Sequence, residues 1–140
     1  MVANAKRHIV VAVEDDRRVR ESMESLIESA GYAPVTFPSG EEFLRSGALT
    51  SASCVITDVR MPGMDGIEVQ RRIRLERQNL PVIFISGHYS AETRQRALQE
   101  GAVGFLYKPF DALGLLNVIQ TALTNTREIG SVSGARAIKE

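Results

Sequence analysis

Residues 54–66, which read CVITDVRMPGMDG, decide the fold. They begin with Cys54–Thr57, an almost continuously apolar run of the kind that forms a strand covered on both faces of a parallel sheet. Asp58 follows this run at once, and Asp65 is placed to cap a helix that starts beside it. The stretch therefore predicts a buried strand, an acid at the end of that strand, a short loop and a helix.

The same succession of apolar run and amphipathic segment recurs along the chain. The other apolar runs are Ile9–Val13, Ala33–Phe37, Val82–Ile85 and Val103–Tyr107. Alternating strands and helices favour right-handed crossovers and an α/β fold, with helices on both faces of a parallel sheet. Pro34 cannot donate a ladder hydrogen bond, so we expect the second strand at an edge of the sheet.

The segments between these runs have apolar residues at helical spacing and recognisable ends. The first helix is expected over residues 17–30, with Gly31 suited to its C-terminal cap. The expected N-caps of the next three helices are Ser39, Asp65 and Ser90. Asp111 is expected to cap a fifth helix, whose inward residues should be Leu113, Leu116, Ile119 and Leu123.

The apolar period stops after about Asn125, and glycine and serine become frequent beyond it. We therefore divide the chain into an N-terminal extension at 1–7, one domain at 8–125, and a tail or the start of a linker at 126–140. A chain of 140 residues is long enough for one domain with a real core.

Composition excludes several classes of protein. The 17 basic and 17 acidic residues give a net charge of zero, which argues against general binding to nucleic-acid phosphates. The single cysteine, Cys54, excludes an internal disulfide, and with two histidines it excludes a zinc site of cysteines and histidines. The first apolar run ends at Glu14 and is too short for a signal-peptide core or a membrane span. We expect a soluble, cytoplasmic domain.

Ligand sites in open α/β sheets lie beyond the carboxyl ends of the strands. The residues at these ends are Glu14-Asp15-Asp16, Thr57-Asp58, Ser86-Gly87 and Tyr107-Lys108-Pro109. Several acids, a hydroxyl and an ammonium group should therefore meet at one edge of the sheet. Two carboxylates about 4 Å apart repel each other by about 4 kcal/mol at an effective dielectric of about 20, so the cluster needs a cation.

A ligand set made only of oxygen atoms points to Mg²⁺ rather than to zinc. With Ser86 and Lys108 nearby, such a site suits phosphoryl transfer to a carboxylate, with Asp58 attacking phosphorus. A flavodoxin-type nucleotide site would instead need a loop rich in glycine, serine or threonine after the first strand. Here that loop, at 14–18, reads EDDRR and would repel phosphate in the absence of a metal.

Four segments resemble the receiver domain of two-component response regulators, most of all its FixJ-like branch. They are Val13–Asp16, Ile56–Gly66, Ile85–His88 and Lys108–Phe110, in the family's order and at its spacing. The resemblance runs from about His8 to Leu123. It implies a single doubly wound (βα)5 domain of the flavodoxin-like, CheY-like type, with strand order 2-1-3-4-5.

The resemblance implies a phosphorylation-controlled switch in phosphorelay signal transduction. Asp58 would accept a phosphoryl group from a histidine kinase. Asp15 and Asp58 would ligate Mg²⁺ directly, with Mn²⁺ as an alternative ion, Glu14 would act through water, and Arg60 would contribute its backbone carbonyl. Such a domain assists its own magnesium-dependent phosphorylation and dephosphorylation but is not a turnover enzyme.

The resemblance also assigns the parts of the switch. Ser86 matches the hydroxyl that moves to the phosphoryl group, Lys108 the ammonium that bonds a phosphoryl oxygen, and Phe105 the aromatic that turns inward. The Lys108–Pro109 peptide bond is expected to be cis. Arg60 and His88 lie two residues beyond Asp58 and Ser86, and from this position we expect them to tune the hydrolysis of the aspartyl phosphate.

Two other functions are weighed against this one. A phosphohydrolase of the haloacid-dehalogenase type would need a second aspartate two residues after the nucleophile, where Arg60 stands, and a substrate-covering cap. A binding module that does not use phosphate would have no need of the acidic pair, Ser86 and Lys108. Plainer interpretations hold elsewhere: Asp16 caps a helix or is solvated, Cys54 fills the core, and Arg71, Arg72, Arg74 and Arg77 form a solvated helix face.

The expected partners follow from the same resemblance. The donor would be a cognate histidine kinase or a phosphotransfer protein. Output would pass to a separate partner or to a fused output domain, and a phosphorylation-dependent dimer could form through the face of the fourth helix, fifth strand and fifth helix. The sequence shows no helix-turn-helix after the fifth helix, so we expect no direct nucleic-acid binding by these residues, and no membrane contact.

Overall fold

The computed structural model describes residues 7–88 and 90–132 and contains one sheet. Its strands are β1 (Ile9–Val13), β2 (Ala33–Phe37), β3 (Cys54–Asp58), β4 (Val82–Ser86) and β5 (Gly104–Tyr107). All neighbouring strands are parallel and lie in the order β2-β1-β3-β4-β5, which confirms the predicted order. Pro34 lies in the edge strand β2, as expected from its missing N–H.

Three strand ends differ slightly from the prediction. β3 and β4 each extend one residue farther, so Asp58 and Ser86 are the last residues of their strands. β5 begins at Gly104 rather than Val103, whose side chain is half exposed while its N–H still bonds the carbonyl of Val82. Asp58 and Ser86 therefore lie at the carboxyl edge of the sheet, as the last residues of β3 and β4.

The helices are α1 (Arg17–Ser29), α2 (Gly40–Ser46), α3 (Gly66–Glu76), α4 (Ala91–Gln99) and α5 (Ala112–Val132). The side chains of Asp16, Ser39, Asp65 and Ser90 accept hydrogen bonds from the first turns of α1 to α4, which confirms these four caps. Asp111 does the same for α5 through the N–H of Gly114 at 2.6 Å. Side-chain oxygens thus satisfy otherwise unpaired N–H groups at the starts of α1 to α5.

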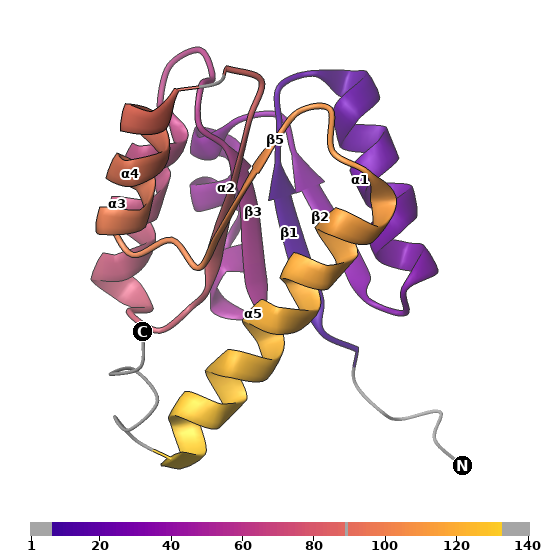
Figure 1. The fold of residues 1–140 in the computed structure, drawn as a ribbon, viewed down its shortest axis with the longest axis vertical. Helices are drawn as coiled ribbons and strands as arrows, with labels where there is room; N and C mark the ends of the chain where they lie inside the picture. Colours follow the sequence, from indigo (N-terminus) through magenta and orange to yellow (C-terminus); the bar gives the residue numbers. More distant parts are fainter. Residues whose placement is uncertain (1–6, 89, 133–140) are drawn as a thin grey trace.

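The sheet lies between two layers of helices (Figure 1). α1 and α5 cover one face, where Met23, Ile27, Leu115 and Ile119 pack on the strands. α2, α3 and α4 cover the other face, where Phe43, Val69, Ile73 and Ala97 are fully buried. Because both faces are covered, the strands are apolar almost throughout, as the sequence predicts.

The inward face of α5 corrects one expectation. Ile119 and Leu123 are buried and Leu116 packs at the rim of the core, but Leu113 is 71% exposed. The buried stripe runs through Leu115, Ile119 and Ala122, with steps of four and three residues, so a residue two positions before its start lies on the opposite side of the helix.

Helix α5 also reaches into the predicted tail, because it continues over 126–132. Residues 133–140 and 1–6 lie outside the described part of the chain, so the proposed domain ends at 8 and 125 remain predictions. Among the described residues, none of the helices combines the length and apolar composition that a membrane span requires.

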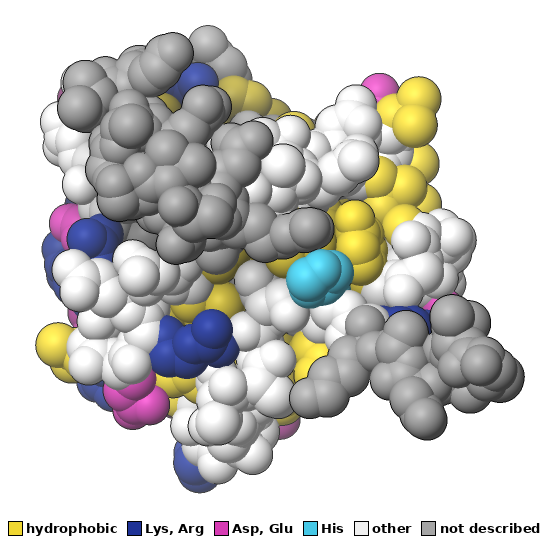
Figure 2. Space-filling model, turned by 90° about the horizontal axis from the view of Figure 1, so that it is seen from below, with side chains coloured by type: hydrophobic (Ala, Val, Ile, Leu, Met, Phe, Trp, Pro, Cys, Tyr) yellow, Lys and Arg dark blue, Asp and Glu magenta, His cyan; other side chains and the backbone are white. Residues whose placement is uncertain are grey.

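At the end of the sheet opposite Asp58, the side chain of Arg77, which follows α3, bonds the segment before β3. Its Nη1 atom donates to the backbone carbonyls of Leu49 at 3.0 Å, Thr50 at 3.4 Å and Ala52 at 2.6 Å, all in the segment before β3. Figure 2 looks at this end of the molecule, where basic, acidic and apolar side chains intermix. Arg77 thereby departs from the expected solvated face, whereas Arg71, Arg72 and Arg74 are exposed as expected.

Candidate functional site

Three carboxylates meet at the carboxyl edge of the sheet. Glu14 and Asp15 follow β1 and Asp58 ends β3, and each offers an oxygen such that the three atoms lie within 4.8 Å of one another. Glu14 is fully buried and Asp58 is 4% exposed, whereas Asp15 is exposed. We call Glu14, Asp15 and Asp58 the acidic trio. The sequence-based expectation that acids from different strands come together is confirmed.

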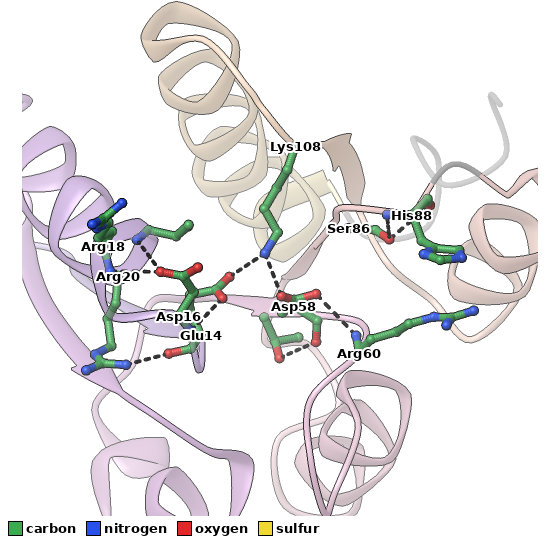
Figure 3. Close-up of polar contacts among 11 residues, drawn as sticks. Glu14, Asp16, Arg18, Arg20, Asp58, Arg60, Ser86, His88 and Lys108 are labelled. Atoms are coloured by element: carbon green, nitrogen blue, oxygen red, sulfur yellow. Dashed lines mark hydrogen bonds and ion pairs between the residues drawn. The ribbon is translucent and has the colours of Figure 1, made fainter.

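Lys108, which follows β5, supplies the positive charge beside the trio. Its Nζ lies 2.8 Å from Asp58 Oδ2 and 3.1 Å from Glu14 Oε1, so one ammonium joins carboxylates from β1 and β3 (Figure 3). These are charge-assisted hydrogen bonds in a largely buried setting, where they are stronger than on an open surface. Lys108 offsets part of the repulsion that the trio would otherwise suffer.

Burial and neighbouring charges at the site shift the pKa values of Glu14 and Lys108. Burial raises the pKa of Glu14 to about 7, and the negative charge of Asp58 acts in the same direction, against hydrogen bonds from the Asp16 N–H and from Lys108. Burial alone would lower the pKa of Lys108, but its hydrogen bonds to Asp58 and Glu14 outweigh this effect, and the pKa is raised. Desolvation is thus the largest single cause at both groups; it sets the direction of the shift at Glu14, whereas at Lys108 the two acids together outweigh it.

The neighbouring acids Asp15 and Asp16 have separate roles. The Asp16 side chain accepts from the N–H groups of Arg18 and Val19 at 2.9 and 3.3 Å, and its own N–H donates to Glu14 Oε2 at 2.9 Å. Asp16 is therefore the cap of α1, and Asp15 is the acid that lies in the trio. The capping role of Asp16 agrees with the sequence-based interpretation.

The loop after β1 is fixed by a contact that the sequence did not indicate. Arg20 Nη1 donates to the backbone carbonyl of Glu14 at 2.8 Å. Arg20 lies one turn inside α1, and an arginine at such a position carries no sequence signal that separates it from a solvated one. This bond holds the backbone that places Glu14 and Asp15 at the site.

Arg60 and Ser86 lie around Asp58 in the described conformation. The N–H of Arg60 donates to Asp58 Oδ1 at 3.2 Å, while its side chain is exposed. Ser86 is buried, and its hydroxyl lies 3.1 Å from both the N–H and the carbonyl of His88. The serine hydroxyl is thus satisfied by local backbone rather than directed to Asp58.

Phe105, Lys108 and Pro109 lie on or just after β5. Phe105 is half-buried against the core cluster on the side of α3 and α4. Its ring packs edge-on against that of Tyr107, with the ring centroids 5.2 Å apart. The Lys108–Pro109 peptide bond is cis. His88 is exposed, and in this structure it contacts Ser86 through backbone atoms.

The donor set of the trio fits a hard divalent cation. It consists of carboxylate oxygens alone, and two of the three side chains are buried. Among the described residues, no other set of three acids, cysteines or histidines lies close enough together to share an ion. Gly66 brings α3 close to this edge, because a Cβ there would lie 2.2 Å from the Asp58 carbonyl oxygen. A glycine is therefore required where α3 starts against the end of β3.

Comparison with known proteins gives a consistent result. The family model described as "Response regulator receiver domain" matches residues 10–120, most of the chain. The response regulator protein TmoT of Ectopseudomonas mendocina is 38% identical over 120 residues, which cover 86% of this chain and 54% of TmoT. The transcriptional regulatory protein FixJ of Bradyrhizobium diazoefficiens is 37% identical over 118 residues, covering 84% of this chain and 57% of FixJ.

Solved structures show the same fold. A response regulator receiver domain protein from Clostridium thermocellum superimposes with a TM-score of 0.82 at 27% identity, over 87% of this chain and 98% of that chain. The structure titled FixJ-N gives a TM-score of 0.76 at 30% identity, over 85% of this chain and 95% of that one. The chain spans about half the length of the curated relatives named above.

The family accounts for the arrangement at the carboxyl edge of the sheet. Receiver domains bind Mg²⁺ at an acidic pocket, and the acidic trio stands at that place. Their role is that of a phosphoryl-accepting switch, generally not of a turnover enzyme. The chain belongs to the receiver domain family of two-component response regulators, with FixJ-like proteins among its relatives.

Proposed function

We propose that Asp58 is the phosphoryl acceptor of this receiver domain and that a phosphohistidine of a histidine kinase, or of a phosphotransfer protein, is the donor. The observation that carries the proposal is that Asp58 lies beside the other two acids of the trio and also accepts a hydrogen bond from Lys108 Nζ, 2.8 Å away. An isolated strand-end aspartate would lack both the acidic partners and the ammonium.

The transfer conserves atoms and electrons. A carboxylate oxygen of Asp58 attacks phosphorus, a new O–P bond forms, and the N–P bond of the phosphohistidine breaks. The electron pair of that bond returns to the imidazole nitrogen of the donor. Lys108 already donates to Asp58 Oδ2 and can pass this hydrogen bond to an oxygen of the phosphoryl group, so its charge stays beside the growing negative charge.

The carboxylates of Glu14, Asp15 and Asp58 and the backbone carbonyl of Arg60 would hold the metal, with Asp15 and Asp58 as direct ligands and Glu14 acting through water. Mg²⁺ is the proposed ion and Mn²⁺ an alternative, since both accept oxygen ligands. When bound, such an ion neutralises carboxylate charge and screens the incoming phosphoryl group.

Phosphorylation would bias an equilibrium between two conformations. In the structure the Ser86 hydroxyl bonds the backbone of His88, so a move toward the phosphoryl group requires it to give up this local pair. Phe105, half-buried beside Tyr107, is the aromatic proposed to turn inward with it. Contacts to Ser86 and Lys108 that exist in one conformation alone are what allow the phosphoryl group to shift the equilibrium.

Hydrolysis of the aspartyl phosphate would end the signal. The side chains of Arg60 and His88 are both exposed near the strand ends that carry Asp58 and Ser86. From this location we propose that they set how readily water reaches the phosphoryl group. The domain would thus assist both its phosphorylation and its dephosphorylation without acting as a turnover enzyme.

Output and location remain part of the proposal. Relatives carry names such as transcriptional regulatory protein and DNA-binding transcriptional regulator, and the matched region is about half of FixJ and 26% of the latter. We propose that this receiver works in the cytoplasm and controls a fused output domain or a separate partner. A phosphorylation-dependent dimer through α4, β5 and α5 is one route, and these residues themselves are not proposed to bind nucleic acid or membrane.

Intact-mass spectrometry after incubation with acetyl phosphate tests the proposal. The wild-type protein should gain one phosphoryl group with Mg²⁺ and none with a chelator, and Asp58→Asn should gain none. Asp65→Asn is the matched control, because asparagine keeps the cap of α3 and the residue lies outside the trio. A folded wild-type protein that stays unmodified, or an adduct that persists in Asp58→Asn, would contradict the proposal.

A further inference from the structure

The loop between β3 and α3 is held by a side chain from a third element. This loop, residues 59–65, carries the Arg60 carbonyl proposed above as a metal ligand. Glu41 lies in the first turn of α2, and its Oε2 accepts a hydrogen bond from the N–H of Met64 at 3.1 Å. The contact joins residues 23 apart in sequence and is part-buried, so it is not a local turn bond.

Two glycines make the approach of Glu41 to the loop feasible. Gly63 has a positive φ of 77°, and a Cβ on it would lie 2.7 Å from Glu41 Oε2, closer than such atoms approach. A Cβ on Gly40 would lie 2.4 Å from Val69 Cγ2, so its absence lets the start of α2 rest on α3. The carboxylate of Glu41 therefore lies directly over the backbone of the loop.

The base of the same loop is fixed in a different way. The N–H of Val59 bonds the carbonyl of Ile85 at 2.9 Å, and the N–H of Gly66 bonds the carbonyl of Val59 at 2.8 Å. The N–H of Arg60 also donates to Asp58 Oδ1, at the end of β3. Among the hydrogen bonds of the described residues, the bond from Met64 is the one that ties this loop to a side chain of another helix. Glu41 thus fixes the loop at Met64, close to the start of α3.

We propose that Glu41 is a positioning residue for the metal site: by holding Met64 it fixes the loop that presents the Arg60 carbonyl to the ion. This inference rests on the proposed metal site and adds to it a residue from α2. Groups that hold metal ligands in place commonly change metal affinity by about 10–100-fold when they are removed. Because Glu41 acts through one loop and one ligand, we expect an effect at the low end of that range.

A purely electrostatic account makes a different prediction. If Glu41 helped only by its negative charge, then any change that removes the charge would weaken Mg²⁺ binding equally. If it acts by accepting the Met64 N–H, glutamine should replace it, because the amide oxygen is also an acceptor. The variants Glu41→Gln and Glu41→Ala therefore separate the two explanations.

The experiment uses the full chain and two readouts. Amide hydrogen exchange of Met64 in the metal-free protein reports the loop contact, and calorimetric titration with Mg²⁺ reports the affinity. For Glu41→Ala we expect exchange at least about tenfold faster and an Mg²⁺ Kd about tenfold higher. Glu41→Gln and the control Glu42→Gln, an exposed neighbour on α2, should stay within about threefold of the wild type in both.

The outcomes are distinguishable. Unchanged exchange of core amides such as Ile83 shows that each variant is folded. Faster Met64 exchange with an unchanged Mg²⁺ affinity in Glu41→Ala would overturn the positioning role while leaving the metal site intact. Equal weakening in Glu41→Gln and Glu41→Ala would overturn it in favour of charge. A wild-type protein that binds no Mg²⁺ would contradict the proposed metal site and this inference together.

Discussion

At each end of the sheet a basic side chain donates hydrogen bonds to oxygen atoms, but the acceptors differ between the two ends. At the carboxyl end, Lys108 bonds the carboxylates of Glu14 and Asp58. At the amino end, Arg77 bonds three backbone carbonyls in the segment before β3. A carboxylate can accept a phosphoryl group, and its negative charge attracts a metal ion. The neutral carbonyls of Leu49, Thr50 and Ala52 accept hydrogen bonds from Arg77 and cannot accept a phosphoryl group. Similar contacts therefore serve a switch at one end and stability at the other.

The largest effect is expected at the amino end. Arg77→Ala leaves three carbonyls without their donor, and hydrogen bonds from charged groups contribute about 1.5–3 kcal/mol each when measured singly. Since one nitrogen serves all three carbonyls, we expect a loss of about 3 kcal/mol in the free energy of unfolding, measured by urea denaturation. Phosphorylation of the folded variant should be unchanged.

Arg72→Ala is the matched control, because Arg72 is exposed and pairs with Glu68 one turn away on α3. Such surface pairs contribute at most about 0.5 kcal/mol. If Arg77→Ala were no less stable than Arg72→Ala, the two ends of the sheet would not differ in the way described.

The second effect sharpens the comparison within the carboxyl end. Asp15 and Asp16 are adjacent and both exposed, but Asp15 belongs to the acidic trio and Asp16 caps α1. Asp15→Asn should weaken Mg²⁺ binding by about 100-fold, which corresponds to about 2.7 kcal/mol. Asp16→Asn should bind as the wild type does, because asparagine also caps helices. Calorimetric titration measures both, and similar losses in the two variants would contradict the division of roles.

A smaller effect concerns pH. The pKa of Glu14 is about 7 in the folded protein and 4.5 in its ordinary state, so the folded protein binds more protons between these values. The contribution of protonated Glu14 to stability is therefore complete below about pH 4.5 and is lost as the pH rises through 7. For the metal-free protein, we expect the titration of Glu14 to lower the free energy of unfolding by about 2 kcal/mol when the pH is raised from 5 to 7.

Glu14→Gln isolates this term, because the amide does not titrate. The difference in unfolding free energy between wild type and variant, measured by denaturation at several pH values in a chelator, should move in favour of the variant as the pH rises. A difference that does not depend on pH would show that Glu14 stays ionised throughout this range.

Most of the fold could be predicted from the sequence because its signals are local. Apolar runs gave the strands, and Asp16, Ser39, Asp65 and Ser90 are caps that act within three residues of themselves. The site could be located because parallel strands bring their carboxyl ends together, so Asp58 and Lys108 meet although 50 residues separate them.

The remaining features depend on contacts between distant segments. Whether Leu113 or Leu115 faces the sheet depends on how α5 is rotated on it, and the sequence offers apolar residues for both choices. Arg77 and Glu41 look like ordinary surface charges in the sequence, and their partners are backbone groups 25–28 and 23 residues away. Backbone partners leave no pattern in side-chain identity.

The most direct test of the central claim is to locate the phosphoryl group on the chain. Protein treated with acetyl phosphate and Mg²⁺ is reduced with borohydride, which converts an aspartyl phosphate to homoserine, and its peptides are then sequenced by mass spectrometry. We predict homoserine at position 58 alone, and none in the chelated sample. Conversion at Asp15, Asp16 or another acid, with Asp58 intact, would contradict the account.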